Sequence, residues 1–306
     1  MTLRQLEVFL AVARARSYRQ AAETLHTSQP ALSQHVRELE GELGTRLFDR
    51  LSRGVVLTEA GRLLEERAKR VFATLTDARE VLGELQGLQR GSLHLGASST
   101  PGIYVLPALI GQFRRRHPGI DLRLRIGNSR VIEAAIRAHE FDLGVVGGHG
   151  LAPGEKCLAA GLVDELVLIV PPRHRWARSR ELAPTALTDE PVLVREEGSA
   201  TRHVTERALE RAGVKWRASM ELDHTEAIKQ AVMAGLGVAF VSVFAVRGEV
   251  ASRHLVALRL RGLRIERHFH VIHNEARTLS AGARAFVAML SERAKRHAAS
   301  LRSKGS

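Results

Sequence analysis

The stretch that decides the fold is Ser17–Leu43, SYRQAAETLHTSQPALSQHVRELEGEL. Ser17 and Ser28 each precede helix-forming residues, and a serine side chain at such a position caps the start of a helix. Pro30 falls in the first turn of the second helix, where no N–H group is needed for an intrahelical hydrogen bond. The stretch therefore predicts two helices joined by the three-residue turn 26–28.

The apolar residues of these helices indicate how the two pack. Ala21 and Ala22 on the first helix are small enough to let the second approach closely. The second helix carries an apolar stripe at spacings of 4, 3 and 4 that points inward: Leu32, Val36, Leu39 and Leu43. Two short helices with this turn and packing are typical of a helix-turn-helix that binds DNA. A small three-helix bundle with no DNA role is the alternative interpretation.

The polar face of the second helix supplies the candidate DNA contacts. Side chains that can hydrogen-bond to base edges share this face, and the helix start is suited to phosphate. The candidates on this helix are Ser28, Gln29, Pro30, Ser33, Gln34 and Arg37. Residues 44–57 predict a β-hairpin, or wing, whose basic residues Arg50 and Arg53 are expected to meet the DNA backbone or minor groove.

Residues 58–88 predict one long helix, with Thr58 as its cap. Apolar residues alternate spacings of 4 and 3 along it, at Leu64, Ala68, Val71, Leu75, Ala78, Leu82 and Leu85. This 3.5-residue period is typical of a coiled-coil seam. A helix of roughly 46 Å needs a partner along such a stripe. We expect self-association through this helix, with packing on the chain's own C-terminal part as the alternative, and a hinge that ends near residue 90.

Residues 91–306 alternate strand and helix patterns, which predicts an α/β class with parallel sheets covered by helices. The pattern predicts one helix over Ile103–Arg116 and a buried strand over Leu236–Val246. A further strand is expected at Glu165–Val170, and the basic tail Arg293–Ser306 is expected to fray.

Hydroxyl side chains follow a strand and open a helix twice in this region. Ser98, Ser99 and Thr100 form the first group. Ser199, Thr201 and Arg202 form the second, and ordinary helix capping is the alternative interpretation for each. Because ligands bind outside the carboxyl ends of parallel strands, two such groups indicate an anion site between two lobes. Asn128 and Ser129 also follow a strand and are expected to complete this site.

The net charge of +13 suggests a polyanionic partner or an anionic ligand. Residues 1–90, however, carry 14 Lys and Arg against 12 Asp and Glu, so the excess lies mostly in residues 91–306. No apolar run approaches the length of a membrane span, and the first residues do not form a signal peptide. We therefore expect a cytoplasmic protein with no membrane partner.

Catalytic and metal-binding interpretations have little support. His268, His270 and His273 look like a cluster, but on a strand the first two share a face and the third points away. We interpret them as edge histidines on a strand that crosses between lobes. Cys157 is the only cysteine and has no obvious partner histidine. We predict no catalytic residues, no metal and no cofactor, and keep an enzyme and a solute-binding protein as remote alternatives.

Residues 9–61 closely resemble the LysR-type transcriptional regulators. The resemblance is carried, among others, by Phe9, Ser17, Ala21-Ala22-Glu23, Ser28-Gln29-Pro30-Ala31-Leu32-Ser33-Gln34, Leu39-Glu40, Leu43-Gly44, Leu47-Phe48, Arg50, Leu57-Thr58 and Ala60-Gly61. Within the family, the chain is most similar to regulators of sulfur assimilation and of carbon dioxide fixation. The residues that suggest this include Gly96–Thr100, Leu106-Pro107, His117-Pro118, Gly127-Asn128-Ser129 and Asp142-Leu143-Gly144.

The resemblance implies a winged helix-turn-helix DNA-binding domain over residues 1–57 and a linker and dimerisation helix with hinge over 58–90. It implies a two-lobed, periplasmic-binding-protein-like effector domain over 91–306. Lobe I is expected at about 91–161 and 267–300, and lobe II at about 162–266.

The implied partners are promoter or operator double-stranded DNA, RNA polymerase and further copies of the chain, as a homodimer or a homotetramer. Regulation is expected through a small anionic effector, with an aromatic or hydrophobic carboxylate as the alternative.

Overall fold

The structure is a computed structural model that describes residues 1–51, 54–85, 91–148, 155–179 and 181–303. The chain divides into two compact units, Met1–Arg79 and Glu80–Ser306. Each unit has its own hydrophobic core.

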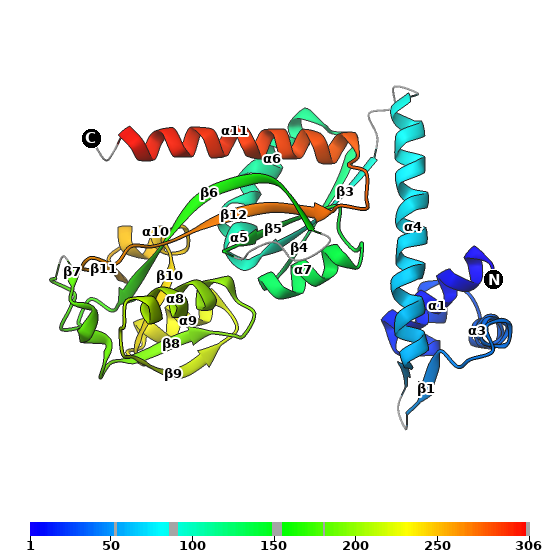
Figure 1. Cartoon of the computed structure of the whole chain (residues 1–306), viewed down its shortest axis with the longest axis horizontal. Helices are drawn as coiled ribbons and strands as arrows, with labels where there is room; N and C mark the ends of the chain where they lie inside the picture. The colour runs from blue at the N-terminus through cyan, green and yellow to red at the C-terminus, as the bar shows by residue number, and fades with distance from the viewer. Residues whose placement is uncertain (52–53, 86–90, 149–154, 180, 304–306) are drawn as a thin grey trace. The chain divides into compact units, whose positions relative to one another are not determined.

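The first unit is a winged helix-turn-helix (Figure 1). Its elements are α1 (Leu3–Ala15), α2 (Tyr18–Thr24), α3 (Gln29–Leu43), β1 (Phe48–Arg50), β2 (Val55–Leu57) and most of α4 (Glu59–Leu85). Both predicted caps are present: the Ser17 hydroxyl accepts from Gln20 N at 3.4 Å, and the Ser28 hydroxyl accepts from Ala31 N at 3.3 Å. Local capping thus fixes where α2 and α3 begin.

Small and apolar side chains bring the three helices together. Ala21 and Ala22 are buried, as are Leu32, Val36 and Leu39 from α3. Leu43, the last residue of the predicted stripe, is exposed at the end of α3. The apolar stripe of α3 is therefore buried along the helix except at its final turn.

Helix α4 begins where the sequence predicts, because the Thr58 hydroxyl accepts from Gly61 N at 3.0 Å. It ends at Leu85, and residues 86–90, which include the expected hinge, lie outside the described residues. Leu64 packs against the core of the first unit and Ala68 is buried. Val71 and Leu82, in contrast, are 39% and 60% exposed. Val71 and Leu82 are therefore exposed apolar side chains on the distal part of the seam.

The second unit is built on a ten-stranded sheet in which two long strands join two parallel halves. The strands are β3 (Gly91–Ser98), β4 (Ile120–Gly127), β5 (Leu143–Gly147), β6 (Glu155–Val170), β7 (Glu181–Leu182), β8 (Pro191–Arg195), β9 (Arg217–Leu222), β10 (Val238–Ser242), β11 (Val256–Leu260) and β12 (Ile265–Asn274). The main order is β4-β3-β5-β12-β6-β10-β8-β9, and β11 pairs with β6 and β7. The pairs β3–β4, β3–β5, β8–β9 and β8–β10 are parallel, as the alternating sequence pattern predicts.

Strands β6 and β12 run antiparallel to each other and cross between the two lobes (Figure 1). Strand β6 is much longer than the expected strand Glu165–Val170. The interpretation of the histidines as edge residues is wrong, because β12 pairs with β5 on one side and β6 on the other. Sequence alternation shows which face a side chain takes but not whether its strand has one neighbour or two.

Helices cover both halves of this sheet. They are α5 (Ser99–Tyr104), α6 (Leu106–Arg116), α7 (Ser129–Arg137), α8 (Ala200–Arg211), α9 (Thr225–Met233), α10 (Val243–Ala251) and α11 (Ala281–Ser303), with a 3-10 turn at Pro184–Leu187. The single helix expected over Ile103–Arg116 is wrong: α5 ends at Tyr104 and α6 starts anew. Pro107 lies in the first turn of α6 and cannot continue an earlier helix, because it has no N–H group.

Two further expectations need correction. The stretch Leu236–Val246 is not one strand, because the Ser242 hydroxyl accepts from Phe244 N and opens α10. A capping serine inside an apolar run thus ends the strand. The tail expected to fray is helical as far as Ser303.

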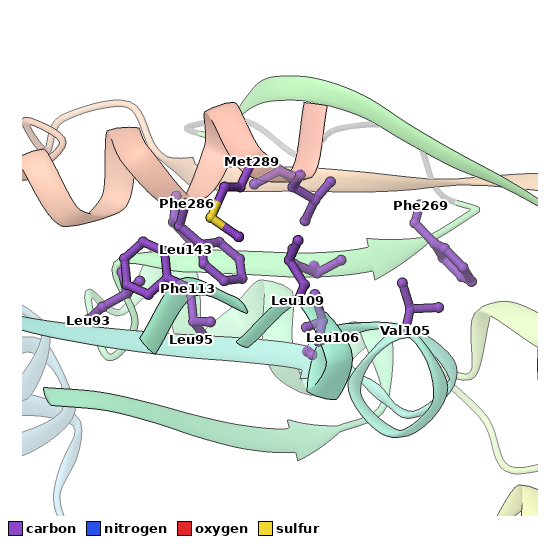
Figure 2. Close-up of a cluster of buried hydrophobic side chains, with 14 of the residues drawn as sticks. Leu93, Leu95, Val105, Leu106, Leu109, Phe113, Leu143, Phe269, Phe286 and Met289 are labelled. Atoms are coloured by element: carbon purple, nitrogen blue, oxygen red, sulfur yellow. The ribbon is translucent and has the colours of Figure 1, made fainter. Parts of the chain in front are cut away.

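The core of lobe I lies between the sheet and the helices α6 and α11 (Figure 2). Phe113 of α6 and Phe286 of α11 meet edge to face, with ring centroids 5.3 Å apart. Leu93 and Leu95 of β3 are fully buried beside them. This packing fixes the strand ends from which the effector site is built. No helix within the described residues is both long and apolar enough to cross a membrane.

Candidate functional site

The exposed face of α3 carries the predicted DNA contacts. Gln29, Pro30, Gln34 and Arg37 are exposed, and Ser33 is half-buried. The Gln34 amide donates to Glu38 Oε1 at 2.9 Å, and Arg37 Nε donates to the Ser33 carbonyl at 3.3 Å. Both side chains therefore have partners within their own helix and retain further donors for a ligand.

The wing is held against α3 by one carboxylate. Glu40 Oε1 accepts from the N–H groups of Leu47 and Phe48, at 2.7 and 3.3 Å. Strand β1 then carries Arg50, which is exposed. The other predicted wing residue, Arg53, lies outside the described residues. Glu40 was not among the predicted site residues, yet it fixes the position of the wing.

The predicted effector residues gather at one small cavity between the two lobes. Lobe I supplies Ser98, the last residue of β3, together with Ser99, Thr100, Asn128 and Ser129, which follow β3 and β4. Lobe II supplies Ser199 and Thr201, at the start of α8. The cavity thus lies outside the carboxyl ends of parallel strands from both halves of the sheet.

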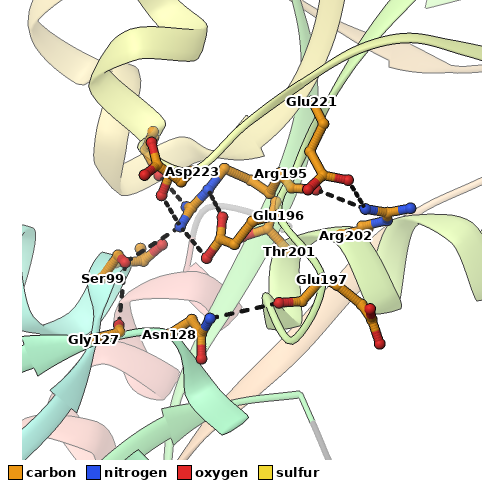
Figure 3. Close-up of polar contacts among 12 residues, drawn as sticks. Ser99, Gly127, Asn128, Arg195, Glu196, Glu197, Thr201, Arg202, Glu221 and Asp223 are labelled. Carbon is orange, nitrogen blue, oxygen red and sulfur yellow. Dashed lines mark hydrogen bonds and ion pairs between the residues drawn. The ribbon is translucent and has the colours of Figure 1, made fainter. Parts of the chain in front are cut away.

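Arg202 does not point into this cavity (Figure 3). Its guanidinium binds Glu206 at 2.8 Å and Glu221 of β9 at 2.6 Å. These hydrogen bonds raise the pKa of Arg202 above its usual value. The step of about 100° between successive helical residues turns Arg202 away from the face that carries Thr201. Its placement in the effector site is therefore wrong.

Arg195, at the end of β8, lines the cavity and was not predicted to do so. Its side chain is 3% exposed. It donates to Thr225 Oγ1 at 2.6 Å, to Ser99 Oγ at 3.4 Å and to both carboxylate oxygens of Glu196 (Figure 3). A single arginine at the end of the otherwise apolar strand 191–195 was the signal that could have identified it.

Arg267 is the second buried arginine at the cavity, and it comes from β12. Its Nη1 and Nη2 atoms donate to Thr201 Oγ1 and Thr100 Oγ1, both at 3.0 Å, so it contacts both lobes. Its Nε atom donates to Asp164 Oδ2 at 2.8 Å. Burial raises the pKa of the Asp164 carboxyl, while the charge of Arg267 and a hydrogen bond from Ser242 oppose that rise. Burial lowers the pKa of Arg267 itself.

Several hydroxyls at the cavity are not used as helix caps. Neither Ser98 nor Ser199 makes a side-chain capping hydrogen bond at the helix that it opens. Ser129 is 1% exposed, and its Oγ atom has no hydrogen-bond partner. A buried hydroxyl without a partner is costly in a folded protein. This hydroxyl is therefore available to a ligand. Asn128, in contrast, does cap α7, because its Oδ1 accepts from Val131 N at 3.0 Å.

Some of the contacts between the two lobes are weak. Asn128 Nδ2 lies 3.5 Å from the Glu197 carbonyl, and Arg130 N lies 3.4 Å from the Gly198 carbonyl. These separations are at the limit for hydrogen bonds. An exposed ion pair between Arg130 and Glu197, of a kind that contributes little stability, adds to them. These exposed contacts therefore add little to the buried hydrogen bonds from Arg267, which also join the two lobes.

The three histidines of β12 and Cys157 are the residues that the sequence offers for a metal or catalytic centre. No group of three or more His, Cys, Asp or Glu side chains there is placed to hold a metal ion. Cys157 does have a histidine neighbour, contrary to expectation: its Sγ atom lies 3.8 Å from His270 Nδ1. Burial and the nearby His268 lower the pKa of His270, so its imidazole is neutral and supplies no charge to a thiolate.

Comparison with known proteins assigns the chain to a family. Residues 3–62 match the bacterial regulatory helix-turn-helix proteins of the lysR family. Residues 86–295 match the LysR substrate binding domain. The chain belongs to the LysR family of transcriptional regulators. LysR-type regulators bind DNA and carry an effector-binding domain, and the predicted two-lobed α/β architecture is confirmed.

Curated relatives among the LysR-type regulators point to carbon fixation. The RuBisCO operon transcriptional regulator of Allochromatium vinosum is 40% identical over 300 residues, which cover 97% of this chain and 98% of the relative. The HTH-type transcriptional activator CmpR of Synechocystis is 34% identical over 94% of this chain and 93% of its own length. The similarity to carbon dioxide fixation regulators is thus confirmed.

Solved LysR-type structures share the fold. A full-length OxyR variant from Pseudomonas aeruginosa matches with a TM-score of 0.75 and 23% identity, over 95% of this chain and 98% of that one. The Synechocystis PCC6803 CcmR regulatory domain, solved in complex with 2-PG, is 30% identical with a TM-score of 0.63. That match covers 67% of this chain and 98% of the CcmR domain.

Proposed function

We propose that this LysR-type regulator binds a promoter or operator duplex through α3 and the wing, and that a small oxyanion in the cleft between its lobes controls it. The observation that carries the effector class is the pair of buried arginines, Arg195 and Arg267, which are 3% and 4% exposed. Both contact hydroxyl-bearing residues on lobe I, so an anion held there would bridge the lobes.

The hydrogen-bonding capacity of the cleft favours an oxyanion. Thr100 and Thr201 accept from Arg267, which leaves their O–H groups free to donate. Ser129 contributes a third hydroxyl, which has no partner. A charged oxygen acceptor forms stronger hydrogen bonds with such donors than a neutral group does. The 2-PG bound by the CcmR regulatory domain is a small anion, and we propose a ligand of this class here.

An aromatic or hydrophobic carboxylate suits this cleft less well. Among the described residues that line it, only Ala200 is apolar and none is aromatic. Sites for aromatic ligands are lined mainly by apolar and aromatic side chains. We therefore retain the small oxyanion as the effector class.

The remaining partners follow from the family and from α4. We propose that two copies associate through the exposed distal seam of α4, that dimers assemble into a tetramer, and that the DNA-bound form recruits RNA polymerase. We propose no enzymatic activity, since the relatives are named as regulators. Because its partners are DNA and RNA polymerase, we propose that it acts in the cytoplasm.

Effector binding is tested with Ser129→Ala. Because Ser129 Oγ has no hydrogen-bond partner, its removal should leave the melting temperature unchanged or slightly higher. If this hydroxyl donates to the effector, the affinity for 2-PG should fall by about 1–2 kcal/mol. Isothermal titration of 2-PG, inorganic phosphate and sulfate into the full chain measures this change.

Thr205→Val is the matched control. Thr205 is also buried, and its hydroxyl also lacks a partner, but it lies on α8 and does not line the cleft. The control should bind each anion as the unmodified protein does. Heat from none of the anions, or equal affinities of the Ser129→Ala variant and the unmodified protein, would contradict the proposed site.

DNA recognition is tested with Gln29→Ala. A glutamine in the major groove pairs with the N6 and N7 atoms of adenine, so its loss should weaken binding to the operator by about 1–3 kcal/mol and relax base preference. Fluorescence anisotropy with operator and random duplexes at one salt concentration measures both effects. An equal loss on the two duplexes would contradict base reading and leave only a role at the phosphates.

A further inference from the structure

A second cavity, lined by four arginines, lies away from the cleft. Arg116 of α6, Arg247 of α10, and Arg293 and Arg296 of α11 line it, and we call it the arginine pocket. Its volume is about 400 Å³, within the range of small-molecule sites. We propose that the arginine pocket is a second anion site, for a small molecule that carries two or more phosphate-like groups.

The electrostatics of the arginine pocket call for an anion. Among the described residues that line the arginine pocket, none is acidic. None of the four arginines lies within 4.0 Å of a described carboxylate, whereas Arg195, Arg202 and Arg267 each do. Four positive charges line one hollow, and an anion bound there would offset their mutual repulsion. Guanidinium groups also match phosphate geometry, because each offers two parallel donors.

The arginine pocket is partly pre-organised. The Arg247 guanidinium lies over the Phe244 ring, 4.7 Å from its centroid, so a cation–π contact favours its observed position. Tyr104, at the end of α5, lines the same hollow and has a phenol group that can donate a hydrogen bond. Because the arginines come from three helices around a concavity, the shape suits a small molecule rather than a flat macromolecular surface.

Two elements connect the arginine pocket to the cleft. Helix α5 begins at Ser99, in the cleft, and ends at Tyr104, in the arginine pocket. Helix α10 starts at Ser242, whose hydroxyl donates to Asp164 Oδ1 at 2.6 Å. Asp164 in turn holds Arg267 in the cleft.

The arginine pocket also spans both lobes, because Arg247 belongs to lobe II while Arg116 and Arg293 belong to lobe I. A change in the angle between the lobes would therefore alter the spacing of its arginines. Occupation of one site should then change the affinity of the other, and the effect must be reciprocal. This coupling rests on the proposed cleft site, whereas the existence of the second site does not.

The experiment uses inorganic pyrophosphate as the probe for the arginine pocket and the double variant Arg247→Gln/Arg293→Gln. Titration into the full chain should show pyrophosphate binding at least about tenfold weaker in the double variant, because two charged donors are lost. Arg115→Gln is the matched control, since Arg115 is the exposed neighbour of Arg116 on α6 and does not line the pocket. The Arg115→Gln control should bind pyrophosphate as the unmodified protein does. Equal binding by the double variant and the Arg115→Gln control would overturn the second site.

A second titration measures the coupling between the arginine pocket and the cleft. In it, 2-PG is added to protein that is saturated with pyrophosphate. The unmodified protein should show a change of about fivefold or more in 2-PG affinity, and the double variant should show none. An unchanged affinity in the unmodified protein would overturn the coupling. Should 2-PG fail to bind at all, the proposed cleft ligand is wrong, while the pyrophosphate comparison still decides the second site.

Discussion

Gly61 shows how a single residue sets the packing of the DNA-binding unit. A Cβ atom at this position would lie 2.2 Å from the Leu47 carbonyl oxygen and 2.9 Å from Leu57 Cδ2. The first turn of α4 thus crosses the chain just before β1 with no room for a side chain. Because the Leu47 carbonyl belongs to the backbone and cannot turn aside as a side chain can, a larger residue must displace the wing or the helix.

We predict that Gly61→Ala destabilises the first unit by about 2–3 kcal/mol through overpacking. Amide hydrogen exchange of α3 in the full chain measures this loss, because exchange reports local unfolding free energy. Gly41→Ala is the control: nothing lies within 4 Å of a Cβ atom there, and Gly41 lies within α3. It should stabilise the unit by about 0.5–1 kcal/mol through helix propensity. Similar protection in both variants would contradict the close crossing.

Glu133 makes the stability of the effector domain depend on pH. Burial, and secondly the charge of Glu155, raise the pKa of Glu133 to about 7, while Arg137 and Arg130 oppose the rise. The ordinary value is 4.5, so the folded state holds this proton more tightly than the unfolded state. The contribution of protonated Glu133 to the free energy of unfolding is fully present below pH 4.5 and is lost as the pH rises through about 7.

Glu133→Gln should remove this dependence. At pH 8 the variant should be more stable than the unmodified protein by about 1–2 kcal/mol, after allowance for solvent screening of a half-buried group. At pH 4.5 the two proteins should differ little. Melting temperatures across this range provide the measurement, with the exposed Glu210→Gln as control. If the Glu133→Gln and Glu210→Gln variants show the same pH profile, Glu133 is not the group responsible.

At the scale of elements, α4 is an apolar surface that is only partly covered. Leu64 packs on the first unit, whereas Val71 and Leu82 remain exposed along the distal seam. Apolar side chains repeated at coiled-coil spacing are stabilised by a second helix. A second copy of the chain is the partner that we propose for this surface.

Val71→Glu should therefore weaken self-association. In the proposed dimer Val71 of each copy would be buried in the seam. Replacing both valines by charged glutamates should therefore raise the dimer dissociation constant by about 100-fold or more. Sedimentation equilibrium of the full chain measures it. Thr76→Glu adds the same charge at an exposed position off the seam and should leave association intact. A protein that is monomeric without substitution, or equal association of both variants, would contradict a role for the distal seam.

At the scale of the whole molecule, positive charge is concentrated away from the DNA-binding unit. Residues 1–90 carry a net charge of only +2, from 14 basic and 12 acidic residues, and residues 91–306 carry the rest of the +13. Affinity for DNA grows with the number of phosphates that basic side chains neutralise. We therefore expect the near-neutral DNA-binding unit to gain affinity when two or more copies of the chain bind the same DNA together. The excess charge of the effector domain instead includes the arginines of the cleft and of the arginine pocket.

The sequence by itself determined the features that depend on neighbours along the chain. Ser17, Ser28 and Thr58 cap helices at the predicted positions, since a cap requires only a side-chain oxygen and an N–H group three residues later. The strand-then-hydroxyl pattern also placed Ser98 and Ser199 at the carboxyl ends of strands, and the α/β alternation predicted the parallel pairing.

Only the tertiary structure decided which cations reach the cleft. Arg195 and Arg267 are 72 positions apart and come from different strands, whereas Arg202 turns to Glu221 instead. The same holds for the arginine pocket, whose residues lie on three helices. Sheet order brings such groups together through long-range packing, and the spacing of residues along a chain does not encode which distant strands become neighbours.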